Sequence, residues 1–215
     1  MSVQQIADGE AGVAGVRGYL HRADDGRDGI VLTHGAGSNC NSPLLAALAD
    51  ALCTAGITVL RCDLPFRQLR PKGPPLGTAK QDQAGLLLVT DFLRQHVSGR
   101  IFLGGHSYGG RMASMLAAEN PSAADGLLLL SYPLHPPRKP EQLRTAHFPE
   151  LRTRALFVRG THDPFASEAE LASALTLIPV ETKCVVLEGA GHELAGKTPK
   201  MAAEKIAQEF QSWMG

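Results

Sequence analysis

One stretch of the chain, residues 99–113, constrains the fold more than any other. Its sequence is GRIFLGGHSYGGRMA, in which three apolar residues lead into GHSYG at 105–109. A G-x-S-x-G motif between an apolar run and helix-forming residues predicts a strand that turns abruptly into a helix. So tight a turn leaves no room for side chains two positions before and after the serine, which accounts for Gly105 and Gly109. We therefore expect Ser107 to be strained and accessible at a helix N-terminus, where free N–H groups favour negative charge.

Apolar runs alternate with helical patterns along the rest of the chain. We expect strands near 13–20, 30–33, 57–60, 101–103, 127–130, 155–158 and 184–187, and helices near 43–55, 78–97, 108–118, 167–177 and from 199. This alternation predicts an α/β fold in three layers, a mostly parallel central sheet with helices on both faces. Two long Pro-rich segments, 63–77 and 132–150, are expected to be loops, and we interpret the second as a small cap loop.

The composition indicates a globular chain of 215 residues, which we interpret as a single domain, residues 1–215. Its formal net charge is zero, which argues against nucleic acid as a partner. No apolar run approaches the ~18 residues of a membrane span. The first ten residues, MSVQQIADGE, lack the basic and apolar regions of a secretory signal. We therefore predict a cytoplasmic protein that does not associate with membranes, and we leave open whether it is a monomer or a homodimer.

The cysteines and histidines do not have the spacing of metal ligands. The four cysteines are scattered, with no C-x-x-C pair, at Cys40, Cys53, Cys62 and Cys184. We interpret them as reduced thiols, mostly buried. We expect no metal site, because the histidines near the serine lack carboxylate or thiolate companions at suitable spacing, and we expect no cofactor.

Four polar residues follow predicted strands and are therefore expected at one edge of the sheet: His34, Ser107, Asp163 and His192. A serine hydroxyl is a poor nucleophile near neutral pH and needs a base within hydrogen-bond reach and an acid to orient that base. The chain offers these groups in the order Ser107, Asp163, His192. We predict that these three residues are catalytic. Alternative acids are Asp125 and Glu188.

An acyl-transfer reaction also needs two N–H donors for the developing oxyanion. We predict that they are the backbone N–H groups of Tyr108, directly after the serine, and of Ala36, in the small-residue loop after the strand at 30–33. Other residues near these loops are candidates for substrate contact: His34, Phe66, His106 and His135.

With these residues identified, the chain resembles small bacterial α/β-hydrolases of the dienelactone-hydrolase-like group. The more specific resemblance is to the branch related to testis-expressed and NSL-complex-subunit hydrolase-like proteins. It extends from about residue 28 to 213 and depends on THGAGSN (33–39), RCDLPFR (61–67), GGHSYGGRMAS (104–114), SYPLHPPRKPEQLRTAHF (131–148), RGTHDPF (159–165) and EGAGHEL (188–194). It implies the α/β-hydrolase fold and assigns Ser107, Asp163 and His192 as the triad. Dienelactone hydrolases use a cysteine where this chain has Ser107, so the resemblance does not imply their substrate.

The hypothesis that follows is a serine hydrolase, specifically a carboxylesterase that acts on small acyl esters or thioesters. Two alternatives remain open. The segment GHELAGKT (191–198) fits the phosphate-binding pattern G-x-x-x-x-G-K-[ST], which would indicate a nucleotide-binding protein. The second alternative is a catalytically silent interaction protein, because the same fold can occur without catalytic activity.

The loops that flank the predicted site are rich in basic residues. Segments 63–77 and 132–154 together carry Arg67, Arg70, Lys72, Arg138, Lys139, Arg144, Arg152 and Arg154 against Asp63, Glu141 and Glu150. A mildly basic mouth would favour a small-molecule ester with an anionic group, whereas a solvated rim would have no preference.

Overall fold

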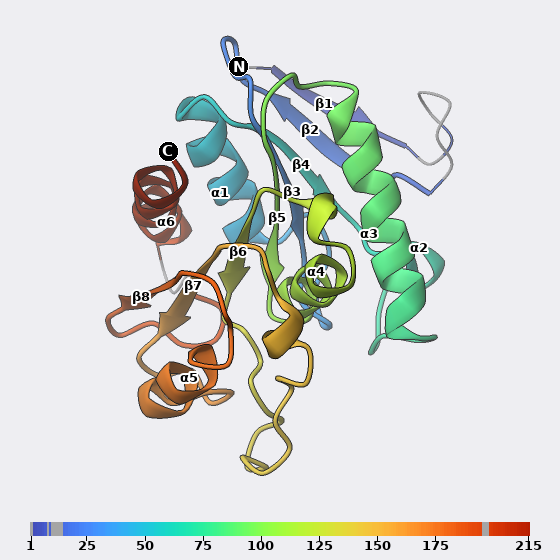
Figure 1. Ribbon diagram of the computed structural model, residues 1–215. Helices are drawn as coiled ribbons and strands as arrows, with labels where there is room; N and C mark the ends of the chain where they lie inside the picture. The colour runs from blue at the N-terminus through green and yellow to red at the C-terminus, as the bar shows by residue number, and fades with distance from the viewer. Residues whose placement is uncertain (1, 8, 10–14, 195–197) are drawn as a thin grey trace.

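The computed structural model describes residues 2–7, 9, 15–194 and 198–215. At its centre lies an eight-stranded sheet in the order β1-β2-β4-β3-β5-β6-β7-β8 (Figure 1). The strands are β1 (Ser2–Ile6), β2 (Gly18–Arg22), β3 (Gly29–Thr33), β4 (Thr58–Cys62), β5 (Ile101–His106), β6 (Gly126–Leu130), β7 (Ala155–Gly160) and β8 (Thr182–Leu187). Strand β2 pairs antiparallel with β1 and with β4, and all the other pairs are parallel. The prediction of a mostly parallel sheet is therefore confirmed.

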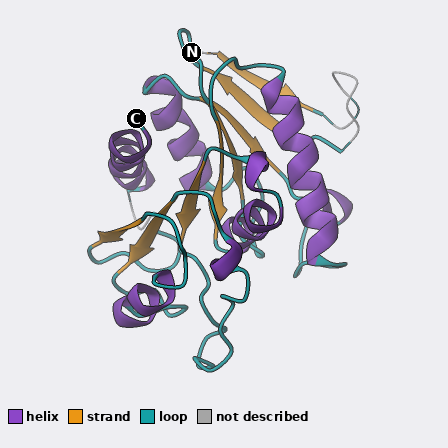
Figure 2. Ribbon diagram, in the orientation of Figure 1, coloured by secondary structure: helices purple, strands orange, loops and turns teal. Residues whose placement is uncertain are grey.

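Helices cover both faces of this sheet (Figure 2). On one face lie α1 (Pro43–Thr54) and α6 (Pro199–Met214), whose apolar side chains pack on the sheet in one core cluster. On the other face α3 (Ala79–Arg94), α4 (Tyr108–Glu119) and α5 (Glu168–Leu175) contribute to a second cluster. Strands β3 and β5 are buried between the two layers, which explains why they consist of apolar and small residues without alternation.

The turn from β5 into α4 has the strained geometry that the motif predicts. Ser107 has φ 52° and ψ −112°, a conformation that L-residues rarely adopt. A Cβ on Gly105 would lie 2.5 Å from Thr33 Oγ1 and 2.7 Å from the carbonyl carbon of Gly109. A Cβ on Gly109 would collide with Thr33 and with the carbonyl oxygen of His34. The glycines are thus needed as much for the close approach of β3 as for the turn itself.

The structure corrects three local predictions. A polar edge strand, β1, was missed, because only Ile6 of its residues is buried and no alternation marks it. The weak strand expected near 13–20 is β2 (Gly18–Arg22). The segment 63–77 is not all loop, since α2 (Pro65–Leu69) lies within it and begins with Pro65 at its first position. The cap loop has the expected irregular course, and its only helical piece is a single 3-10 turn at Phe148–Glu150.

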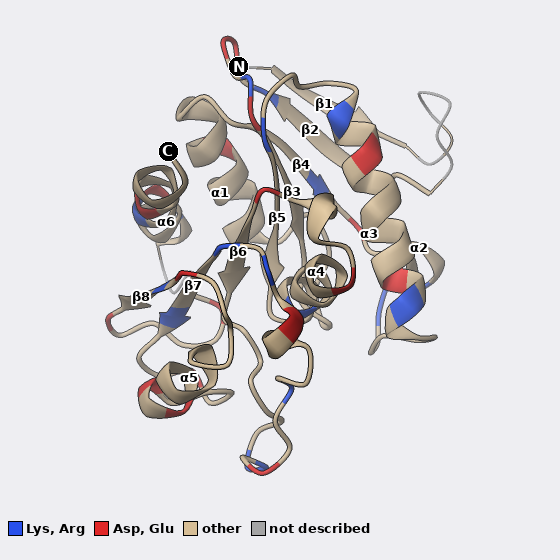
Figure 3. Cartoon of the chain, viewed as in Figure 1, with Lys and Arg blue, Asp and Glu red and all other residues tan. Residues whose placement is uncertain are grey.

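Charged residues of both signs are interspersed over the described chain (Figure 3). No described helix combines the length and the apolar character that crossing a membrane would require. The cysteines are free, and Cys40, Cys53 and Cys62 are buried whereas Cys184 is exposed.

Candidate active site

Three side chains from three separate loops meet in one line of hydrogen bonds. Nε2 of His192, in the segment after β8, lies 2.9 Å from Oγ of Ser107 at the start of α4. Nδ1 of the same imidazole lies 3.0 Å from each carboxylate oxygen of Asp163, which follows β7. All three loops leave the carboxyl ends of parallel strands, so the topology alone brings them to one edge of the sheet. The structure therefore brings together the three residues that the sequence predicted to act together.

The environment of Asp163 keeps its carboxylate ionised. Burial of the side chain would by itself raise the pKa of this carboxyl. Hydrogen bonds from the His192 imidazole and from the Phe165 N–H, the latter at 2.9 Å, outweigh this effect and lower the pKa below its usual value. An ionised carboxylate at Nδ1 orients the ring so that Nε2 faces Ser107 without its proton.

The backbone of His192 is held by two side chains. Its carbonyl oxygen accepts hydrogen bonds from Ser131 Oγ at 2.6 Å and from His106 Nε2 at 2.8 Å. The Phe165 ring lies against the His192 imidazole, with centroids 4.1 Å apart. Ser131, at the end of β6, is fully buried and has a positive φ of 47°. Sequence analysis missed Ser131, and its only sequence signal is a polar residue directly after an apolar strand.

The two predicted oxyanion donors line the same cavity of about 660 Å³ as Ser107 and His192. Tyr108 is the first residue of α4, so its N–H has no acceptor within the helix. Its side chain is fixed, because the hydroxyl donates to Asp82 Oδ2 at 2.7 Å. The Ala36 peptide is anchored from behind, where the buried Arg67 donates from Nη2 to the Ala36 carbonyl oxygen at 2.6 Å.

Of the four residues expected to contact substrate, only His106 lines this cavity. His34 is fully buried behind it, where its Nε2 accepts the Leu64 N–H at 3.2 Å and so holds the loop that carries Ala36. Phe66 is buried and packs edge-on against the rings of His34 and Tyr108. His135 is buried beside α5, with Nε2 3.6 Å from Glu170. These three side chains lie outside the cavity, and the sequence could not distinguish such positions from ones that line it.

The basic residues that line the cavity also differ from those expected in the flanking loops. Of the eight basic residues in the two flanking loops, only Arg144 lines the cavity, and Arg67 is a buried anchor instead. A second lining arginine, Arg111, lies on α4 one helical turn after Ser107, to whose carbonyl its N–H donates at 3.0 Å. Sequence analysis did not select Arg111, although its spacing of four residues from the serine was available.

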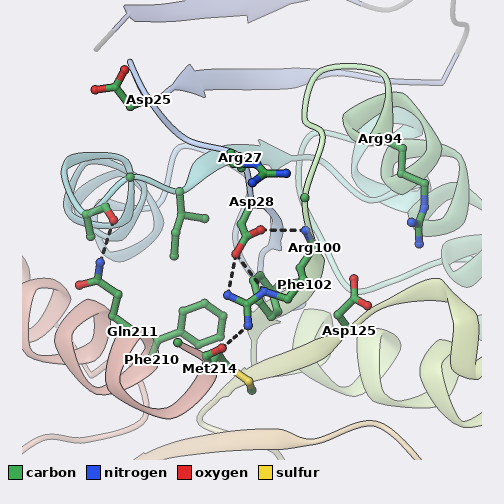
Figure 4. A pocket seen from close by; sticks show the side chains of 15 residues that line it. Asp25, Arg27, Asp28, Arg94, Arg100, Phe102, Asp125, Phe210, Gln211 and Met214 are labelled. Atoms are coloured by element: carbon green, nitrogen blue, oxygen red, sulfur yellow. Dashed lines mark hydrogen bonds and ion pairs between the residues drawn. The ribbon is translucent and has the colours of Figure 1, made fainter.

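A larger cavity, of about 770 Å³, lies at the opposite edge of the sheet (Figure 4). Several of its charged side chains already have partners, since Arg100 pairs with Asp28 and also donates to the Met214 carbonyl oxygen. Asp125 accepts the Ile101 N–H at 2.8 Å. These contacts tie the amino ends of the strands together, so we assign this cavity a structural role. Of the candidate phosphate-binding segment 191–198, residues 195–197 lie outside the described chain.

Comparisons with known proteins identify the family and the fold of this chain. Residues 26–214 match the model of a family described as alpha/beta hydrolase domain. A dienelactone hydrolase from Anabaena variabilis is similar in structure, with a TM-score of 0.77 at 21% identity over 98% of this chain and 97% of that one. Est1E from Butyrivibrio proteoclasticus has a TM-score of 0.77 at 16% identity over 100% and 99% of the two chains, and another structure of it holds ferulic acid.

A third similar structure is a serine hydrolase without a lid from Xanthomonas campestris. Its TM-score is 0.72 at 16% identity, over 92% of this chain and 89% of that one. At these identities the structures establish the fold, which is the α/β-hydrolase fold that the sequence predicted. Since the family model spans most of the chain, the protein belongs to the alpha/beta hydrolase domain family.

Proposed function

We propose that the chain is a serine hydrolase, a carboxylesterase that acts on small acyl esters or thioesters. One observation carries the proposal, the hydrogen-bonded line from Ser107 Oγ through His192, 2.9 Å away, to Asp163, 3.0 Å beyond. A hydroxyl, an imidazole and a buried carboxylate in this order constitute the arrangement that activates serine for attack on an acyl carbon.

In the proposed mechanism, Ser107 Oγ bonds to the acyl carbon while its proton passes to Nε2 of His192. Asp163 stabilises the resulting imidazolium, and the N–H groups of Tyr108 and Ala36 stabilise the oxyanion. When the intermediate collapses, the alcohol or thiol leaves with the proton from His192. A water molecule, deprotonated by the same imidazole, then attacks the acyl-serine and releases the acid.

A small substrate is favoured by the shape of the site. The cavity of about 660 Å³ lies within the range typical of small-molecule sites. The cap loop beside it has no helix beyond the 3-10 turn at Phe148–Glu150, and it contributes only Pro133 and Arg144 to the lining of the cavity. Est1E, which has a similar fold, binds ferulic acid, a ligand of this size class. We also place the chain in the dienelactone-hydrolase-like group, without its cysteine nucleophile.

The experiment is labelling of the purified protein with a fluorophosphonate, which reacts with an activated serine whatever the natural substrate is. We expect the parent to be labelled, Ser107→Ala to be unlabelled and His192→Ala to react at least ~10³-fold more slowly, because no base remains to take the proton. Ser173→Ala is the matched control, since Ser173 is exposed on α5, and it should be labelled like the parent.

Absence of labelling in the folded parent would refute the proposal and would favour a silent interaction protein. Labelling that persists in Ser107→Ala would show that another serine is the nucleophile. Hydrolysis of long-chain esters as fast as short ones would refute the part of the proposal that concerns substrate size.

A further inference from the structure

A single buried carboxylate, that of Asp82, is bonded to two helices near Ser107. Asp82 lies in the first turn of α3, which packs against both α2 and α4 (Figure 1). Its Oδ2 accepts the hydroxyl of Tyr108 on α4 at 2.7 Å. Its Oδ1 accepts the backbone N–H of Phe66 on α2 at 3.1 Å. The two oxygens of one side chain therefore join α2 to α4.

The contact with α2 fixes the start of a very short helix. α2 has five residues, and the first N–H groups of a helix have no acceptor within it. The residue before α2 is Leu64, whose side chain has no oxygen that could cap these groups. Asp82 accepts the Phe66 N–H in its place. A residue of α3 thus has the role that an N-cap residue usually has within its own helix.

α2 in turn holds Ala36, one of the two predicted oxyanion donors. Arg67, directly after Phe66, is buried and donates from Nη2 to the carbonyl oxygens of Ala36 at 2.6 Å and of Gly73 at 3.0 Å. Its Nη1 donates to the Arg70 carbonyl oxygen at 3.1 Å. These bonds fix the guanidinium relative to α2, so a shift of α2 would displace the Ala36 peptide as well.

The contact with α4 fixes the side chain of the other predicted donor, Tyr108. Burial and the bond to Asp82 raise the pKa of Tyr108, so its hydroxyl keeps its proton and donates. The Tyr108 ring also packs edge-on against Phe66, with centroids 5.6 Å apart. Burial raises the pKa of Asp82 itself, and its two hydrogen bonds oppose this effect. Since a buried carboxylate is costly without donors, Asp82 stabilises the arrangement in which α2 and α4 both contact it.

Building on the proposed ester hydrolysis, we propose that Asp82 is a positioning residue for the two oxyanion donors. It holds α2, and through Arg67 the Ala36 peptide, at a fixed distance from the N–H of Tyr108. Two donors stabilise an oxyanion fully only if both point at the position that the oxygen occupies in the tetrahedral intermediate. Loss of Asp82 should therefore weaken binding of the transition state and leave binding of the ester itself unchanged.

The first test separates kcat from KM in the hydrolysis of a short-chain aryl ester. Asp82→Ala should lower kcat about ten- to a hundredfold with little change in KM, because a donor is displaced and not removed. Asp82→Asn keeps an oxygen for the Phe66 N–H and should recover most of that loss. Asp82→Ser serves if Asp82→Ala does not fold, since its hydroxyl is too short to join both helices but leaves room for water at the freed N–H.

Val89→Ala is the matched control for a loss of stability. Val89 is a buried residue of the same helix, α3, and its truncation leaves a small cavity in the core. Its kcat and KM should equal those of the parent, although its free energy of unfolding is lower.

The second test uses a trifluoromethyl ketone, to which Ser107 Oγ adds to form a tetrahedral oxyanion that resembles the intermediate. For Asp82→Ala its inhibition constant should rise by the factor by which kcat/KM falls, a proportionality that a merely structural role would not produce. Because Asp82 acts through α2, the double variant Asp82→Ala/Arg67→Met should lose no more kcat than Arg67→Met alone.

The proposal would be overturned by parental kcat and parental inhibition in the folded Asp82→Ala or Asp82→Ser. A change in KM alone, or additive losses in the double variant, would also overturn it. In each of these cases labelling of the parent by fluorophosphonate would still support a serine hydrolase. A folded parent that is not labelled would refute hydrolysis and, with it, the positioning role of Asp82.

Discussion

Ser131 provides a sharp test of how His192 is positioned. Its hydroxyl donates to the His192 carbonyl oxygen at 2.6 Å, and its backbone has a positive φ of 47°. Replacement by alanine removes the hydrogen bond and keeps the strained backbone. Replacement by glycine removes the same hydrogen bond but relieves the strain, because glycine has no Cβ. A comparison of the two variants therefore separates the effect of losing the hydrogen bond from the effect of the strained backbone conformation.

The expected changes in the free energy of unfolding follow from these two differences. Loss of one buried hydrogen bond costs about 1 kcal/mol, and His106 still satisfies the carbonyl oxygen in the alanine variant. Glycine recovers about 1–2 kcal/mol of left-handed strain. It loses about 0.4–1 kcal/mol of that gain through the greater freedom of its unfolded chain. Ser131→Ala should thus be about 1 kcal/mol less stable than the parent, and Ser131→Gly should be within about 0.5 kcal/mol of it.

Activity should follow the hydrogen bond and not the stability. Displacement of a catalytic group by about 1 Å can cost ~10²-fold in rate, and with the His106 contact intact we expect a loss of about tenfold in kcat for both variants. Urea denaturation measures stability, and hydrolysis of a short-chain aryl ester measures kcat and KM. If Ser131→Gly is destabilised as much as Ser131→Ala, the strain argument is wrong. If both retain full kcat, Ser131 has only a structural role.

Three further predictions concern the supports of the site. Asp163→Asn should lower kcat about 10⁴-fold while the circular dichroism spectrum is unchanged, and near-parental kcat would exclude Asp163 as the orienting acid. Tyr108→Phe removes the hydroxyl that bonds Asp82, so urea denaturation should show a loss of about 1–3 kcal/mol, and unchanged stability would contradict that bond. Burial and the charge of Arg111 lower the pKa of His147 in the cap loop from 6.5 to about 4. Between these two pH values the unfolded chain therefore binds more protons than the folded chain, and the free energy of unfolding falls as the pH falls. The contribution of His147 to this fall in the free energy of unfolding is at most about 3 kcal/mol, and it should be absent in His147→Gln. The prediction is wrong if His147→Gln and the parent show the same pH dependence of stability.

Much of the site could be predicted from the order of residues along the chain. Ser107, Asp163 and His192 each follow an apolar run, and parallel strands with right-handed crossovers bring the ends of such runs to one edge. The motif around Ser107 also predicted the strained turn, since a strand that reverses into a helix leaves no room for side chains at Gly105 and Gly109. These are local or topological constraints, which a sequence expresses directly.

Only the tertiary structure decided which side chains line the cavity next to Ser107 and which are buried outside it. His34 follows β3, and Phe66 and Arg67 lie on α2. Packing buries all three side chains outside the cavity, whereas Arg111 and Arg144 reach it. The difference depends on side-chain direction and on contacts between segments far apart in sequence, such as Arg67 with the Ala36 carbonyl oxygen at 2.6 Å. A loop composition carries neither kind of information, because the same residues can face water, core or ligand.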